Sequence, residues 1–433
     1  MNRPALSGRH FAACLVGLVA ASAAPSAGAF VLADTCGHSE PDCPVLHWET
    51  DGDPIPFRLH HDGSDEHSMW SIETRVRSAF GTWAAVEGAD IDFLEGGIFM
   101  GAADYQETDA IDRQSVLFFM EEGWAPRSPE VIALTSISFG EGGVIIEADI
   151  GFNADDWTFT VGDSGVRVDF LSIAVHEIGH FLGLDHSEED GATMNARYTE
   201  GDTSLRDLTD DDRAGISAMY PCEDVPCVGD VGPGCSMGAV SPRQALAVLL
   251  LVLLGASARD RRRRARLSGA AVLGLMLLVP NPSTGSVVES LDVDALAARA
   301  DLVVRARVAD VEPYLAGKVR SRISLDVLEA LRGLAPETIV IDQPGGRLPT
   351  LGTYVFGMPR FEVDREVVVF LSWPEGGAPR VLGLAQGKMT VEADGSLTRD
   401  LSGLALASMG RTRPATSASL PGGVEGLRLR LAR

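Results

Sequence analysis

The amino-acid sequence predicts a mixed α+β domain in the first half of the chain and a separate all-β domain in the second half. Three observations lead to this prediction: an amphipathic helix pattern at residues 71–87, a series of short strand patterns between 91 and 152, and two helix patterns after 170. Helices and strands mixed in this way are typical of an α+β layer arrangement. A chain of 433 residues also exceeds what one hydrophobic core usually serves, so we expect at least two domains.

The helix at 71–87 and the strands around it follow from hydrophobic spacing. Residues 45–60 have the composition of a strand. The helix pattern places apolar side chains one turn apart, which predicts one buried stripe made by Ile72, Val76, Ala79, Phe80, Trp83 and Val86. Short runs rich in β-branched and aromatic residues, separated by glycine- and proline-containing turns, predict strands at 91–93, 115–119, 131–139 and 144–152.

Two helices are predicted after these strands. Residues 170–184 form a strongly apolar run of helical length. Residues 208–221 have Thr209 as an N-cap, three aspartates in the first turn and Pro221 beyond the last turn. We therefore expect one folded domain within residues 30–230.

The N-terminus has the layout of a secretory signal peptide, assigned to residues 1–29. Basic residues precede an apolar run at 11–23 that is too short to span a membrane, and Ala27-Gly28-Ala29 supplies the small residues of a cleavage site. Export permits disulfides. Five cysteines follow this segment, and the simplest arrangement is two short-loop disulfides, with Cys235 left over: Cys36 with Cys43, and Cys222 with Cys227.

The charge is distributed very unevenly. Residues 30–240 contain 42 acidic residues, 9 arginines and no lysine, whereas the whole chain has a net charge of −25. Nucleic-acid binding needs a basic surface, so this composition excludes it for the first half. Bound cations, high-salt surroundings and a plain solvated acidic surface all remain open.

The stretch from His176 to His186, HEIGHFLGLDH, carries the clearest chemistry. His176 and His180 are four residues apart and lie on one helix face, where two imidazoles can hold one zinc ion with Glu177 between them. Gly183 can adopt a positive φ, end the helix and let His186 arrive as a third ligand. Three protein ligands leave one position open, as in catalytic zinc sites. The alternative is a helix end whose histidines are satisfied by hydrogen bonds.

With this motif, residues 45–221 resemble a metzincin metalloprotease of the matrixin type. Further cues are Ser187 directly after His186 and the segment LTDDDRAGISAMYP at 208–221. The resemblance implies a mixed twisted sheet with three helices, Met194 as the methionine beneath the metal and Tyr198 in the wall of the specificity pocket. It also implies that 131–139 is the edge strand that pairs with an extended substrate.

The same resemblance implies a mechanism, and the sequence also departs from the matrixin pattern. Zinc would activate water and polarise the scissile carbonyl, with Glu177 as general base. Leu134 stands where many matrixins have a histidine for a structural zinc, so we do not expect that second zinc. Ca²⁺ as a structural ion is compatible with the acidic loops, though no EF-hand pattern occurs. Cys36 is either a disulfide partner of Cys43 or a thiolate that blocks the zinc.

The sequence therefore predicts an exported zinc metalloendopeptidase acting on proteins or peptides. Two alternatives remain: a non-catalytic surface or adhesion protein on a metzincin scaffold, and a metallopeptidase that acts on cell-wall peptides.

Residues 231–266 resemble the sorting tail called MYXO-CTERM, with Gly-Cys-Ser around Cys235, an apolar helix and an arginine cluster. This implies attachment to the membrane or cell surface through Cys235; a plain membrane anchor is the alternative. A second apolar segment follows at 267–283. Either the chain forms a membrane hairpin, or two neighbouring genes have been joined in one translation.

Residues 284–433 have strand patterns with short turns, and an OB-like barrel is one arrangement that such strands form. The patterns lie at 300–311, 321–331, 338–346, 366–373 and 387–396. This unit contains no histidine or cysteine, and we expect Arg347 and Gln386 to be surface or turn residues. Because these residue types are absent, we expect this unit to serve in binding or in stability.

Overall fold

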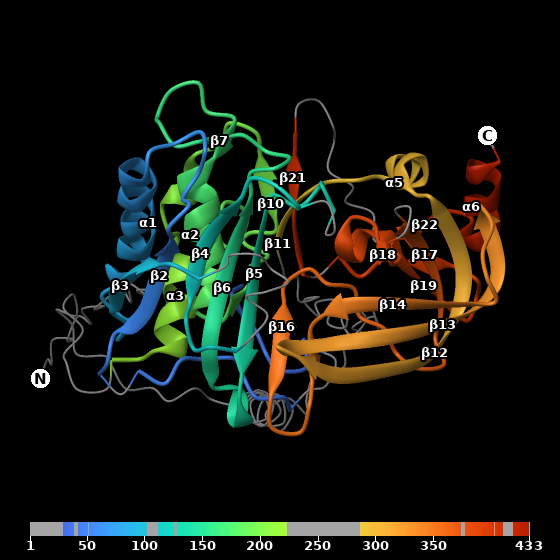
Figure 1. The fold of residues 1–433 in the computed structure, drawn as a ribbon, viewed down its shortest axis with the longest axis horizontal. Helices are drawn as coiled ribbons and strands as arrows, with labels where there is room; N and C mark the ends of the chain where they lie inside the picture. The colour runs from blue at the N-terminus through green and yellow to red at the C-terminus, as the bar shows by residue number, and fades with distance from the viewer. Residues whose placement is uncertain are drawn as a thin grey trace, which may run out of the picture.

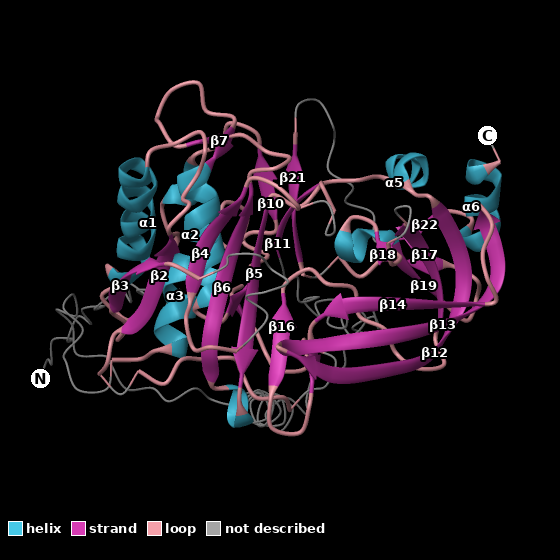
Figure 2. Ribbon diagram, viewed as in Figure 1, coloured by secondary structure: helices cyan, strands magenta, loops and turns pink. Residues whose placement is uncertain are grey.

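The structure is a computed structural model, and two units lie side by side in it (Figure 1). It describes residues 29–38, 42–50, 52–101, 111–124, 128–222, 286–373, 377–401, 403–409 and 419–432. The first half of the chain, coloured blue to green, combines a sheet with helices, and the gold-to-red second half is mainly strands (Figures 1 and 2).

Five strands of the first half form one mixed sheet. Its order is β5-β6-β4-β2-β3, and β5 runs antiparallel to β6 while the other neighbours run parallel. The strands are β2 (Ile55–His60), β3 (Phe93–Phe99), β4 (Val116–Met120), β5 (Ala133–Phe139) and β6 (Ile145–Asn153). The sheet and its strands agree with the predicted pattern to within a few residues at most boundaries; of the stretch 45–60, only the last six residues form a strand.

Three helices complete the first half, as the sequence predicts: α1 (Met69–Ala84), α2 (Phe170–Phe181) and α3 (Asp210–Met219). α1 buries Ile72, Val76, Ala79, Phe80 and Trp83. The indole Nε1 of Trp83 donates to the carbonyl of Val175 at 2.8 Å, which ties α1 to α2. α3 begins with a capping box between Thr209 and Asp212.

Short elements connect these parts. They are β1 (Val31–Leu32), η1 (Glu141–Gly143), β7 (Phe159–Thr160), β8 (Val168–Asp169), β9 (Leu184–Asp185), β10 (Arg197–Thr199) and η2 (Ser204–Arg206). β1 pairs with β9 in antiparallel fashion, so the first described residues lie beside the segment that leads to His186.

The second unit is built around an open sheet with the order β14-β13-β12-β17-β19-β20-β22, and β18 pairs with β17. Its strands are β12 (Leu302–Ala316), β13 (Lys318–Arg332), β14 (Thr338–Pro344), β17 (Glu366–Ser372), β18 (Arg380–Val381), β19 (Lys388–Val391), β20 (Leu397–Thr398) and β22 (Ser419–Leu420). The remaining elements are β11 (Ser286–Glu289), α5 (Val293–Arg299), β15 (Gly346–Arg347), β16 (Gly352–Val355), η3 (Leu384–Gly387), β21 (Leu404–Ser408) and α6 (Gly423–Leu431).

The predicted strand content of this unit is found, but three expectations need correction. The unit contains the helices α5 and α6 and is therefore not all-β. Among the described residues its main sheet is open, with no pairing between the end strands β14 and β22, so no OB-like barrel closes. The unit is also not separate, because β15 and β16 extend the first sheet at β5, and β21 lies between β11 and β10. Strand patterns identify strands but carry no information on distant pairing partners.

Several predicted segments lie outside the described residues: nearly all of the signal peptide at 1–29, the tail at 231–266 and the second apolar segment at 267–283. Within the described part of the chain, no helix has the length and apolar character needed to cross a membrane.

Candidate metal centre

Helix α2 carries the two histidines that are four residues apart. Asp169 caps its N-terminus, with the carboxylate accepting from the backbone N–H of Ser172 at 2.9 Å, and Arg206 holds the same carboxylate at 2.6 and 2.8 Å. All twelve residues of α2 are buried, including both histidines. The apolar sequence explains this placement, since a helix that is hydrophobic all round belongs in a core.

Gly183 turns the chain after α2, as predicted. Its φ is +95°, and a Cβ there would lie 2.2 Å from the carbonyl oxygen of Leu46. Glycine is therefore required both by the left-handed backbone and by the space. The turn brings His186 back toward the two helical histidines.

The three imidazoles converge on one point. The Nε2 atom of His176 lies 3.1 Å from that of His180 and 2.7 Å from that of His186, and the last two are 3.2 Å apart. Nδ1 of His176 bonds to the carbonyl of Thr193 at 2.7 Å, and Nδ1 of His180 to that of Leu184 at 2.9 Å. A carbonyl only accepts, so Nδ1 carries the hydrogen and the Nε2 lone pair faces the centre.

This donor set fits zinc. In His176 and His180 the Nε2 lone pairs therefore face each other and Nε2 of His186 in a buried site, which is unfavourable unless a cation lies between them. Tetrahedral zinc with bonds of ~2.0–2.1 Å would separate the nitrogens by about 3.3 Å, only a few tenths more than two of the three observed distances. Burial, together with the neighbouring histidines, lowers the pKa of His186 well below its usual range, which keeps it in the neutral form that binds metal.

Glu177 lies beside this cluster and is fully buried. One carboxylate oxygen accepts from the hydroxyl of Thr135 at 2.5 Å, and the other from the backbone N–H of Val287 at 3.5 Å. Burial raises the pKa of Glu177 to about 7, against the opposing effect of these two hydrogen bonds. A carboxylate with such a pKa can take up and release a proton near neutral pH.

Met194 lies directly beneath the helix that carries the histidines. A Cβ on Gly179 would come within 2.2 Å of its sulfur, so only glycine allows this packing. Asp212 holds the backbone in place, accepting from the N–H groups of Thr193 and Met194 at 2.8 and 2.9 Å. The carbonyl of Thr193 in turn accepts from Nδ1 of His176. Asp212 therefore helps to position His176 through the backbone of Thr193 and Met194.

Tyr198 is buried on β10. Its hydroxyl accepts from the N–H of Asp169 at 2.8 Å and donates to the carbonyl of Arg167 at 3.1 Å. Burial raises the pKa of Tyr198 to about 12, so the hydroxyl stays protonated. The side chain fixes β10 to the start of α2.

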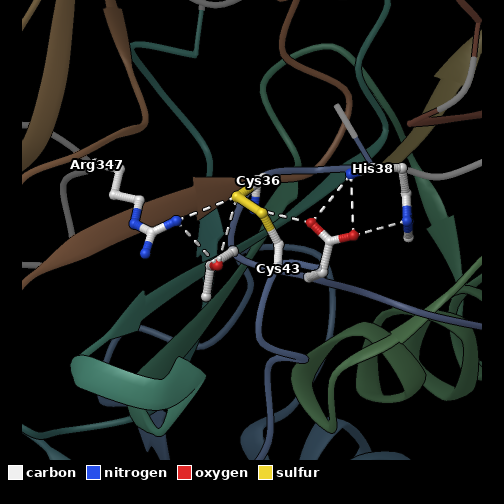
Figure 3. The surroundings of a disulfide bond; sticks show 6 residues. Cys36, His38, Cys43 and Arg347 are labelled. Atoms are coloured by element: carbon white, nitrogen blue, oxygen red, sulfur yellow. Dashed lines mark hydrogen bonds and ion pairs between the residues drawn. A yellow bond between two sulfur atoms is a disulfide. The ribbon is translucent and has the colours of Figure 1, made fainter. Parts of the chain in front are cut away.

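Cys36 and Cys43 form a disulfide, the first of the two pairings that the sequence favours (Figure 3). Because Cys36 is bonded to Cys43, it is not the zinc-blocking thiolate that was considered as the alternative. Arg347 approaches Cys36 Sγ at 3.1 Å, and His38 bonds to Asp34 and Asp185 at 2.8 and 3.0 Å. Hydrogen bonds to Asp185 and Asp34 raise the pKa of His38 to about 9. This links the disulfide loop to the residue before His186.

The other cysteine predictions remain open. Cys222 is described, but Cys227 and Cys235 lie outside the described residues.

Gln386 was expected to be a surface or turn residue; it lies in the short 3₁₀ helix η3, but not at the surface. Its side chain is fully buried, accepting from the N–H of Leu291 at 2.7 Å and donating to the carbonyl of Glu289 at 3.0 Å. Polar composition suggests exposure, but an amide can be buried when backbone groups satisfy it.

Three residues at the centre were not identified from the sequence. Thr135 lies within the predicted edge strand, and Asp212 is the third helical residue after the Thr209 cap, so both had a local signal. Phe356 stacks on His180 with ring centroids 4.2 Å apart, although it is 176 residues away in sequence. No local pattern could have identified that contact.

Residues 47–221 match the family model described as Matrixin. This part of the chain is a matrixin domain. The Metalloendoproteinase 1-MMP of Arabidopsis thaliana is 31% identical over 154 residues, which cover 34% of this chain and 38% of the relative. Stromelysin-3 of Rattus norvegicus is 42% identical over 74 residues, covering 17% of this chain and 14% of the relative. Matrilysin of Homo sapiens is 37% identical over 79 residues, covering 18% and 28%.

These matches span well under two thirds of each relative. The family supports a metalloendopeptidase that uses zinc.

Proposed function

We propose that the matrixin domain is a zinc-dependent endopeptidase in which His176, His180 and His186 bind the metal and Glu177 is the general base. The observation that carries this proposal is the convergence of three histidine Nε2 atoms beside the buried carboxylate of Glu177. A merely structural site would not require a carboxylate with a pKa raised to about 7 at this place.

Each protein group has a defined task in hydrolysis. Zinc, when bound, would supply Lewis-acid polarisation of the scissile carbonyl and make water more acidic. Glu177 then takes the proton from the attacking water and delivers it to the leaving amine. Thr135 orients that carboxylate through its hydroxyl. Met194 and Asp212 keep His176 of α2 in place.

The substrate class follows from the sheet edge. β5 is one of the two end strands among the matrixin domain's own five strands, and an extended protein or peptide segment could pair with it. Tyr198 on β10 is proposed to form part of the pocket wall. Export through residues 1–29 and attachment through Cys235 remain part of this proposal, as does a structural Ca²⁺.

The test combines zinc content with hydrolysis in the chain from residue 30 onward. We expect one zinc per chain in the unaltered protein and in Glu177→Ala, and we expect every detectable cleavage of a quenched fluorescent peptide to disappear in Glu177→Ala. His186→Ala should lose zinc itself. Absence of zinc from the unaltered protein would contradict the proposal. Cleavage that persists in Glu177→Ala would assign the base to another residue.

A further inference from the structure

We propose that the second unit is an intramolecular inhibitor, which occupies the substrate groove of the matrixin domain and keeps the enzyme latent until it is displaced. This inference rests on the proposed endopeptidase function, because it concerns the regulation of that same site. It follows from four independent sets of contacts between residues 286–409 and the groove.

The first set covers the edge of β5. β16 pairs with it in antiparallel fashion, with Gly352 opposite Phe139 and Val355 opposite Ser136. The N–H of Phe356 continues this ladder by donating to the carbonyl of Thr135 at 3.3 Å. Figure 1 shows β16 directly beside β5. Since a backbone group of an edge strand joins one ladder at a time, a substrate cannot pair here while β16 is present.

β11 covers the rest of this edge. The N–H of Ile132 donates to the carbonyl of Val287 at 2.9 Å, and the N–H of Glu289 donates to the carbonyl of Glu130 at 2.7 Å. Val131 and Val288 form an antiparallel bridge between these bonds. The two segments of the second unit therefore occupy the edge from residue 130 to residue 139.

The second set reaches the catalytic residues themselves. The backbone N–H of Val287 points to the carboxylate of Glu177, and the ring of Phe356 stacks on His180. Glu177 and the three histidines are fully buried in the presence of these groups. A catalytic centre has to admit water and a peptide, so the buried arrangement is that of a closed state.

The third set lies at β10, the strand that carries Tyr198 and that we propose as the wall of the groove opposite β5. β21 pairs in parallel fashion with β10, with Tyr198 opposite Ala407, and β21 also pairs with β11. The strands therefore run in the order β10-β21-β11, and β11 meets the edge of β5. Two strands of the second unit lie between the two walls of the groove.

The fourth set consists of ion pairs to buried carboxylates of the matrixin domain, which fix the second unit in place. Lys318, at the turn between β12 and β13, is 7% exposed and forms an ion pair with Asp149 on β6, with Glu147 3.5 Å away. Arg299 on α5 pairs with the buried carboxylate of Glu130 at 2.9 Å. Removing one partner of a buried pair leaves a charge without compensation, which is strongly unfavourable.

The experiment measures access to the groove in the full chain from residue 30 onward. Gly352→Val opens the β16 pairing, because a Cβ at this position would lie 2.1 Å from the ring of Phe139. Lys318→Ala is the milder second variant, since it removes a buried ion pair without creating a clash. Leu334→Gln is the matched control, on the same unit but 99% exposed. Peptide hydrolysis, zinc content and hydrogen exchange of the β5 amides are recorded for each protein.

We expect slow hydrolysis and protected β5 amides in the unaltered chain and in Leu334→Gln. We expect at least tenfold faster hydrolysis and exchange in Gly352→Val and Lys318→Ala. Hydrolysis in the unaltered chain as fast as in both opened variants would overturn the inhibitor proposal and leave the endopeptidase intact. Rapid exchange of β5 in the unaltered chain would overturn it as well. If Gly352→Val and Lys318→Ala bind zinc and show rapid exchange of the β5 amides but no hydrolysis, the result would support the occupation of the groove. It would overturn the proposed endopeptidase function.

Discussion

Gly183 and Gly191 show how the same backbone conformation has different consequences at two positions near the candidate metal centre. Both have a positive φ, +95° and +88°. A Cβ on Gly183 would overlap the carbonyl of Leu46, whereas a Cβ on Gly191 would have nothing within 4 Å. The first glycine is needed for space and conformation, and the second for conformation alone.

We expect Gly191→Ala to lower the free energy of unfolding by about 1 kcal/mol, from the left-handed conformation alone. Gly183→Ala should cost about 2–4 kcal/mol, because overpacking adds to that strain. It should also weaken zinc binding, since Gly183 directs the chain to His186. Urea unfolding and zinc titration of both variants test this prediction. Equal losses in the two variants would contradict the role of the contact with Leu46.

At the scale of elements, helices and strands with a clear period were predictable from the sequence. α2 and α3 follow from an apolar run and from the Thr209 cap, and the candidate ligands His176 and His180 follow from their spacing on α2. The pairing of β16 with β5 could not be predicted, because four residues of alternating pattern fit many edges. The resemblance therefore implied an edge strand at 131–139, but no pattern in the sequence indicated that β16 pairs with it.

The junction of β6 with the β12–β13 turn contains an acid with a strongly shifted pKa. Burial raises the pKa of Glu147 to about 7; Lys318 opposes the shift, while Asp149 and Asp112 add to it. One carboxylate oxygen also accepts from the backbone N–H of Arg113 at 2.8 Å. Because the folded chain binds this proton more tightly than the unfolded chain, the stabilising contribution is complete below about pH 4.5 and is lost as the pH rises through about 7.

Glu147→Gln tests this dependence, because glutamine stays neutral and keeps an acceptor oxygen for the backbone. We expect the free energy of unfolding of the unaltered protein to fall, relative to this variant, by on the order of 1–3 kcal/mol between pH 5 and pH 8. Urea midpoints at several pH values measure it. Glu141→Gln, at an exposed position on the preceding turn, is the control and should leave the pH profile unchanged. If the unaltered protein instead loses stability relative to Glu147→Gln as the pH falls, the expected direction of the pH dependence would be wrong.

At the scale of the whole molecule, a hydrophobic cluster to which both units contribute joins them, beside two clusters that the second unit forms by itself. Val287, Phe356, Ala405 and Ala407 belong to the same cluster of buried residues as the apolar side chains of α1 and α2. Two sheets are also continuous across the boundary, through β16 with β5 and β21 with β10. Units with separate cores unfold separately, whereas a shared core couples them.

We therefore expect the chain to unfold in one calorimetric transition although its size would allow two. Phe356→Ala removes a fully buried ring at the boundary and should lower the stability by about 3–5 kcal/mol. If the units are coupled, this loss divides the single transition into two, with the matrixin domain melting separately from the second unit. Leu334→Ala, at an exposed position, should change neither the midpoint nor the number of transitions. Two transitions in the unaltered chain, neither moved by Phe356→Ala, would mean that the shared core contributes little, and the second unit could then leave the groove without a large free-energy cost.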